Sequence, residues 1–203
     1  MMKYIIAVLF LGITAGYLCN AWGFQFLNPI LSDYVFNICL LLLLFLMGVL
    51  FGMDRKAASQ LSHVGIKILV FPFAIALGSI AGGLVGALLL RVDIYASMGV
   101  CAGCGWYTLT GPLAGQLFGI EWAAVGFAVN FLRELITIVL AAQASRIDKY
   151  APVAMGGATA MDTTLPAILS SSGQDALLTA FISGFTLTML APLLISFIAT
   201  LTH

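Results

Sequence analysis

The chain has 203 residues, of which 62% are hydrophobic and 8% charged, and its mean hydropathy is +1.13. An ordinary soluble domain is nearer half apolar and a quarter charged, so the composition excludes that class and indicates an all-α integral membrane protein. The formal net charge is zero and no run of basic residues exists, which argues against nucleic acid as a partner and leaves the lipid bilayer.

Seven apolar segments follow one another along the chain. The first, 4–22, begins like a secretory signal, with Lys3 ahead of the apolar stretch. It is long enough to cross a hydrocarbon core of about 30 Å, and further segments follow, so we interpret it as a retained helix. The others lie at 34–53, 65–90, 96–118, 122–144, 152–170 and 176–201.

Four cysteines lie within the apolar segments: Cys19, Cys39, Cys101 and Cys104. No histidine is near enough in sequence to complete a zinc-like ligand set. The "CAGC" spacing permits a redox or metal pair, but we interpret these cysteines as small buried packing residues.

Two of the segments are interrupted near their middle. The segment 96–118 contains "GCGWYTLTGP", and 152–170 contains "GGATAMDTTLP", so glycine, threonine and proline stand where a continuous helix would have leucine. A broken backbone leaves N–H and C=O groups unpaired, which hydrocarbon does not tolerate. Both breaks should therefore line a wet cavity or be buried in protein.

Basic residues predict how these segments cross the membrane. The loop "MDRKAASQLSHVGIK" is rich in basic residues and should be cytoplasmic, which also places the N-terminus inside. Arg146 and Lys149 then reach the cytoplasm only if the segment 96–118 enters from outside and turns back. Arms at 94–104 and 112–120, each about 15 Å long, suit such a hairpin.

The predicted fold therefore has about five transmembrane helices and two opposed re-entrant hairpins, near 94–120 and 150–173, with the C-terminus outside. Seven full spans remain as the alternative, with less agreement among the charges. We expect 1–64 to be an N-terminal helical hairpin serving as scaffold or interface, and 65–203 to be a transport core. Two inverted repeats would bring the hairpin tips together near the midplane, where secondary transporters bind their cargo.

An acid lies deep in the predicted fifth segment. Glu134 follows Trp122 by about twelve residues, or about 18 Å of helix, which places it near mid-membrane. Asn130 stands four residues earlier on the same helix face. Arg133 points about a hundred degrees away and is expected to meet another group.

A second acid, Asp162, belongs to the second interruption. Two carboxylates among hydroxyls and aromatic rings form a credible site for a cationic ligand. The alternative is that Arg133 and Glu134 form ion pairs that only fix helix packing. The further predicted site residues are Trp106, Tyr107, Thr108 and Thr110 in the first interruption, and Thr159, Thr163 and Thr164 in the second.

Three motifs in order, "GCGWYTLTGPLAGQLFG", "NFLRELITIVL" and "GGATAMDTTLPAIL", resemble the lysine exporter family, LysO. The resemblance runs from about Leu40 to the C-terminus and is most specific between Met98 and Leu169. It implies export of L-lysine and its analogues across the bacterial inner membrane, in exchange for protons and without another cofactor. The acidic residues of the family carry over to Glu134 and Asp162.

The sequence departs from the longer members of the family by lacking an extra N-terminal bundle. The resemblance therefore implies a homodimer, or a small membrane companion subunit that supplies the missing part. Lysine carries two ammonium groups and one carboxylate, so two acids and the N–H groups of the hairpins would complement its charges.

Two other classes stay open. A sodium or proton antiporter of similar broken-helix design would use the same two acids, and a non-transporting membrane subunit would use neither. An intramembrane enzyme is disfavoured, since no serine and histidine come together at membrane depth: His63 is in a loop and His203 is terminal.

Overall fold

The computed structural model describes residues 67–202 without a gap, together with short pieces between residues 11 and 53. Contacts divide the chain into two compact units, Met1–Arg55 and Lys56–His203, and the helices described below all belong to the second. The first two predicted segments, 4–22 and 34–53, are described only in part, in short pieces. The predicted scaffold of residues 1–64 stays a prediction.

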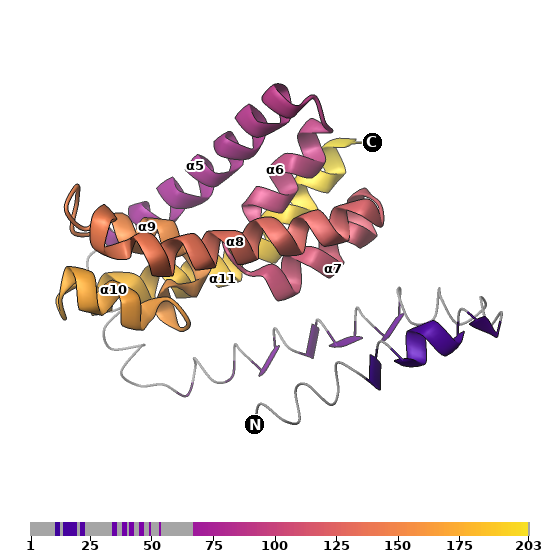
Figure 1. Ribbon diagram of the computed structural model, residues 1–203, viewed down its shortest axis with the longest axis horizontal. Helices are drawn as coiled ribbons and strands as arrows, with labels where there is room; N and C mark the ends of the chain where they lie inside the picture. Colours follow the sequence, from indigo (N-terminus) through magenta and orange to yellow (C-terminus); the bar gives the residue numbers. More distant parts are fainter. Residues whose placement is uncertain are drawn as a thin grey trace. The chain divides into compact units, whose positions relative to one another are not determined.

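Three long helices frame the second unit (Figure 1): α5 (Lys67–Leu90), α8 (Glu121–Ala144) and α11 (Ala176–Ala199), the last followed by the 3-10 helix η3 (Thr200–Thr202). Each long helix has 24 residues. The stretches Val70–Leu90, Glu121–Ala144 and Ala176–Thr202 are long and apolar enough to cross a membrane. The predicted helices at 65–90, 122–144 and 176–201 are thus confirmed.

Two short helices replace a continuous one between α5 and α8: α6 (Ile94–Ala102) and α7 (Tyr107–Phe118). Asp93 caps α6, since its side chain accepts a hydrogen bond of 2.7 Å from the backbone N–H of Ala96. The second arm starts at Tyr107, five residues before the predicted start at residue 112. Pro112 lies inside α7 and does not begin it. Buried neighbours such as Leu113 hold the helix together although the proline lacks an N–H.

The second interrupted segment is divided more finely, into α9 (Ala151–Gly156), the 3-10 helix η2 (Gly157–Met161) and α10 (Leu165–Ser172). Pro152 and Pro166 stand in the first turns of α9 and α10, where a missing N–H costs nothing. The prolines that make the segment look broken therefore start its short helices.

Close contacts show that α6 and α7 run back along each other. A Cβ added to Gly103 would collide with Thr110, and one added to Gly99 would lie 2.5 Å from the Phe118 ring. Such approaches are open to glycine because it has no side chain.

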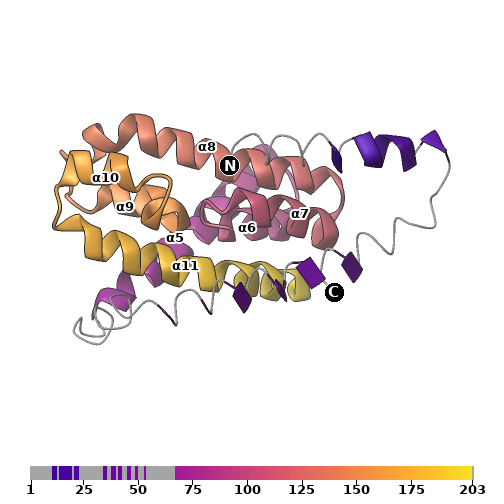
Figure 2. The ribbon, with the colours of Figure 1, turned by 90° about the horizontal axis from the view of Figure 1, so that it is seen from below.

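Figure 2 shows α8 along one side of the unit and α11 along the other, with the short helices between them. Glycines let the layers approach: a Cβ on Gly126 of α8 would lie 2.9 Å from the Thr110 carbonyl, and one on Gly184 of α11 would lie 2.8 Å from Met161. Across residues 67–202 the regular structure is helical and no strand occurs. The number of spans, the re-entrant character of the short pairs and the sides of the termini stay predictions.

Gly157→Ala is expected to destabilise the unit by about 2–4 kcal/mol. Gly157 has φ 61° and ψ −122°, and an added Cβ would collide with the Cys104 carbonyl. Thermal unfolding in detergent measures the effect. Gly173→Ala is the control, because Gly173 also has positive φ (82°) but nothing within 4 Å of an added Cβ. An equal loss of stability in Gly157→Ala and Gly173→Ala would contradict a role for close packing at Gly157.

Candidate functional site

The two breaks meet in space. The backbone N–H of Ala158 in η2 donates a hydrogen bond of 2.8 Å to the carbonyl of Cys104, in the turn between α6 and α7. Both breaks use left-handed backbone, with φ of 50° at Cys104, 103° at Gly105 and 61° at Gly157. Gly105 and Gly157 adopt positive φ without strain because glycine has no Cβ, whereas Cys104 is a non-glycine residue in this region.

Asn130 of α8 holds the first break in place. Its side-chain oxygen accepts a hydrogen bond of 2.6 Å from the N–H of Gly105, and its amide group donates to the carbonyls of Val100 (2.9 Å) and Gly126 (3.0 Å). The residue is 1% exposed. Asn130 therefore satisfies backbone groups that the break would leave unpaired, and its predicted role in binding stays a prediction.

Arg133 holds the second break in a comparable way. Its guanidinium donates to the carbonyls of Met155 (2.8 Å) and Ala154 (2.9 Å), and to the Ser79 hydroxyl of α5 (2.7 Å). The carbonyls end the short helix α9, where a positive charge is favourable. Arg133 thus does meet a group other than Glu134, as its angle on the helix predicts.

Glu134 has a different environment. The residue is 8% exposed, and within the described part of the chain its Oε2 has no hydrogen-bond partner. The side chain of Thr163 lies beside the Glu134 carboxyl, and Asp162 is close enough for the two charges to interact. Tyr107, the first residue of α7, is near both acids. Glu134 thus lies within electrostatic range of Asp162 and Tyr107, and the predicted facing of the two carboxyls across a common pocket stays a prediction.

Asp162 and Thr163 form the accessible side of this group. Both are exposed, and an Asp162 oxygen accepts a hydrogen bond of 2.6 Å from the backbone N–H of Thr163. Thr108, in the first turn of α7, is also exposed. We use the name acid pair for Glu134 and Asp162.

The alternative of purely structural ion pairs finds no support among residues 67–202. The ion pair recorded there joins Lys149 to Asp175 at 2.8 Å, on the exposed surface. Arg133 binds carbonyls and a hydroxyl, so the acid pair has no basic partner in this part of the chain.

Four of the predicted site residues contact the core or the local backbone. Trp106 packs against a core cluster that includes Ile75 and Leu187. The hydroxyls of Thr110, Thr159 and Thr164 are buried and donate to nearby carbonyls: Trp106 (2.8 Å), Gly156 (2.9 Å) and Thr159 (2.9 Å), respectively. Buried hydroxyls need such partners, and here the backbone supplies them.

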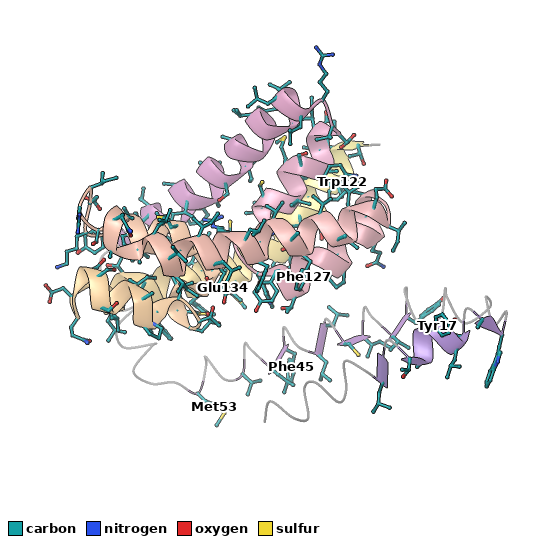
Figure 3. All side chains as sticks on the ribbon, in the orientation of Figure 1. Tyr17, Phe45, Met53, Trp122, Phe127 and Glu134 are labelled. Atoms are coloured by element: carbon teal, nitrogen blue, oxygen red, sulfur yellow. The ribbon has the colours of Figure 1, made fainter. Side chains whose placement is uncertain are left out.

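Two aromatic residues that sequence reasoning missed lie next to the site. Phe127 and Phe131 of α8 form a ring cluster with Tyr107, at centroid distances of 5.3 and 5.5 Å from it. Phe127, Phe131 and Glu134 recur at intervals of four and three, so they share one stripe of the helix. That spacing is the signal that could have found them. Figure 3 shows Phe127 and Glu134 on the same side of α8.

Asn130→Ala is expected to lower the free energy of unfolding by about 2 kcal/mol, because the Gly105 N–H and the Val100 carbonyl lose their partner in a buried position. Thermal unfolding in detergent measures it. Asn130→Asp keeps the acceptor for Gly105 but cannot donate to Val100, so it should recover only part of the loss. If Asn130→Ala is as stable as the wild type, Asn130 does not hold the first break in place.

Comparison with known proteins agrees with the motifs. The family model described as lysine exporter LysO matches residues 6–199, so the similarity begins well before Leu40, where the motif resemblance starts. Lysine exporter LysO of Escherichia coli (strain K12) is 34% identical over 160 residues, which cover 78% of this chain and 52% of that protein. This chain thus spans about half the length of that relative.

A relative from Haemophilus influenzae, named as a proposed lysine exporter, is 26% identical over 208 residues, covering 98% of each chain. No solved structure matches the chain. Its apolar helices and its matches to this transporter family make it a membrane protein. Since the family model covers nearly the whole length, the chain belongs to the lysine exporter LysO family.

Proposed function

We propose that this chain exports L-lysine and lysine analogues across the bacterial inner membrane in exchange for protons. The observation that carries the proposal is the acid pair where two broken helices meet. Its buried member, Glu134, is 8% exposed and has an oxygen without a partner among the described residues. A carboxylate in such a place is costly unless a cation or a proton joins it. Membership in the lysine exporter family supports lysine as that cation.

The charges of the site complement those of lysine. The acid pair can neutralise the ammonium groups, because Arg133 is engaged by carbonyls and does not compete for it. Helices α7 and α10 begin beside the acid pair, at Tyr107 and Leu165, and neither has a side-chain cap. Helix N-termini favour anions, so they suit the lysine carboxylate.

Exchange of lysine for protons needs no ionisable group beyond the acid pair. Each carboxylate can hold an ammonium or a proton, but not both, so protons arriving from outside displace lysine and lysine inside displaces protons. Intramembrane acids serve as proton carriers in many pumps and transporters. In this scheme the two short-helix pairs are re-entrant hairpins, and the N-terminus lies inside and the C-terminus outside.

We also propose that the working unit contains more than one chain. About half of the Escherichia coli relative has no counterpart in the match, whereas the Haemophilus influenzae relative matches end to end. A second copy of this chain, or a small membrane companion, would complete that unit.

Lysine counterflow into liposomes that contain this chain, with and without a companion, tests both the cargo and the autonomy of the chain. We expect labelled lysine to exchange against internal lysine, and lysine addition to move protons. Sodium-dependent proton movement without lysine exchange would instead identify an antiporter of inorganic cations. Absence of both lysine exchange and proton movement under every condition would contradict the transport proposal.

A further inference from the structure

We infer that the rings of Tyr107, Phe127 and Phe131 form a wall against which the aliphatic stem of the cargo lies. The acid pair would select for positive charge, and this ring wall would select a long alkyl-ammonium over a short one or an inorganic cation. The inference rests on the proposed function and assigns the part of the site that recognises the stem.

The three rings hold one another in a fixed arrangement. Tyr107 meets Phe127 at 5.3 Å and 76°, and Phe131 at 5.5 Å and 83°, both edge to face. Phe127 and Phe131 stack at 5.7 Å and 21°. Each distance and angle is within the favourable range for aromatic pairs. A wall of this kind is already ordered before a ligand arrives, so little conformational entropy is lost on binding.

The ring wall leads directly to the acid pair. Phe127, Phe131 and Glu134 form one stripe on α8, about 10 Å long from first to last. Tyr107 joins this stripe from the start of α7 and lies near both Glu134 and Asp162. An ammonium group at the acid pair would therefore have ring surface on the side toward the start of α8.

The rings are also available for contact. Phe127 is 45% exposed and Phe131 is 36% exposed, and Tyr107 is half-buried. Trp106, the neighbour of Tyr107, is also partly buried, but it packs against a core cluster and has no ring contact with the other three in the described residues.

The chemistry of a diamino acid fits this arrangement. The four-carbon stem of lysine is about 5 Å long, so it fits along the stripe. Each methylene removed from water gains free energy, and the ammonium end gains from ring faces as well as from carboxylates. An inorganic cation gains nothing from the apolar part of the wall.

Transport by inside-out vesicles, prepared from cells that produce the full chain, tests the inference. Uptake of lysine is compared with uptake of 2,4-diaminobutyrate, which carries the same charged groups on a stem two carbons shorter. In the wild type we expect the KM for lysine to be about tenfold lower than that for diaminobutyrate. Phe131→Ala should narrow this ratio to within about threefold by raising the lysine KM. Phe131→Leu keeps apolar surface and should preserve most of the ratio.

Phe73→Ala is the matched control, because Phe73 is a ring on α5 with 49% exposure. It should leave the ratio unchanged. An unchanged ratio in Phe131→Ala, whether neither KM moves or both rise together, would overturn the inference and make the rings lipid-facing or packing residues. No preference for lysine in the wild type would also overturn it. Absence of lysine transport in the wild type would instead remove the proposed function, and the ring wall with it.

Discussion

Glu134→Gln is expected to reduce lysine efflux from loaded vesicles by about 100-fold, because a charge-assisted contact worth about 1.5–3 kcal/mol is lost together with a proton carrier. The amide has nearly the same shape as the carboxyl, so the protein should still fold and accumulate in the membrane. Asp162→Asn should cause a smaller loss, about tenfold, since Asp162 is exposed and its charge is partly screened. Initial rates of efflux at equal protein amounts measure both effects.

Glu121→Gln provides the control for this experiment. Glu121 is the first residue of α8 and is exposed, so the same chemical change is made on the same helix but about 20 Å along it from Glu134. Its efflux should stay near the wild-type rate. Normal efflux from Glu134→Gln would remove Glu134 from the mechanism, whereas equal losses in both variants would point to a general effect of charge on the helix.

Arg133→Ala is expected to lower the free energy of unfolding by about 2–4 kcal/mol. The change removes hydrogen bonds to Ala154, Met155 and Ser79, and so separates α8 from α9 and α5 at once. Arg133→Lys should recover only part of this stability, because an ammonium group lacks the planar fork that reaches three partners. Thermal unfolding in detergent measures the loss.

Lys149→Ala is the matched control for Arg133. It also removes a cation and its partner contact, the 2.8 Å bond to Asp175, but both side chains are largely exposed. Exposed ion pairs contribute little, so the unfolding temperature should barely change. If Arg133→Ala unfolds at the same temperature as Lys149→Ala, the guanidinium does not hold the second break.

The helices and their breaks could be predicted from the sequence because each depends on local properties. Long apolar runs predict α5, α8 and α11 nearly to the residue, since bilayer crossing imposes both length and composition. Glycine and proline predict the two interruptions, although Pro112 turned out to lie inside α7. Counting residues along one helix also placed Glu134 near the middle of α8, where the structure has it as a buried residue.

The roles of individual polar residues could not be predicted in the same way. Asn130 and Thr164 are polar residues within apolar segments, as Glu134 is. Asn130 bonds backbone groups of a break distant in sequence, and Thr164 bonds a carbonyl of its own turn. Phe127 and Phe131 are hidden in an apolar stretch, where most rings face lipid. Only the position of Tyr107, which comes from another helix, distinguishes them.

The most direct test of the acid pair as a cargo site is the accessibility of the residue beside it. Thr163→Cys places a thiol at an exposed position next to Glu134 and Asp162, and its reaction with a small water-soluble thiol reagent is measured above the wild-type background. We predict rapid labelling that lysine slows and sodium does not. Labelling no faster than the background, or labelling that lysine leaves unchanged, would contradict a hydrated lysine site between the two broken helices.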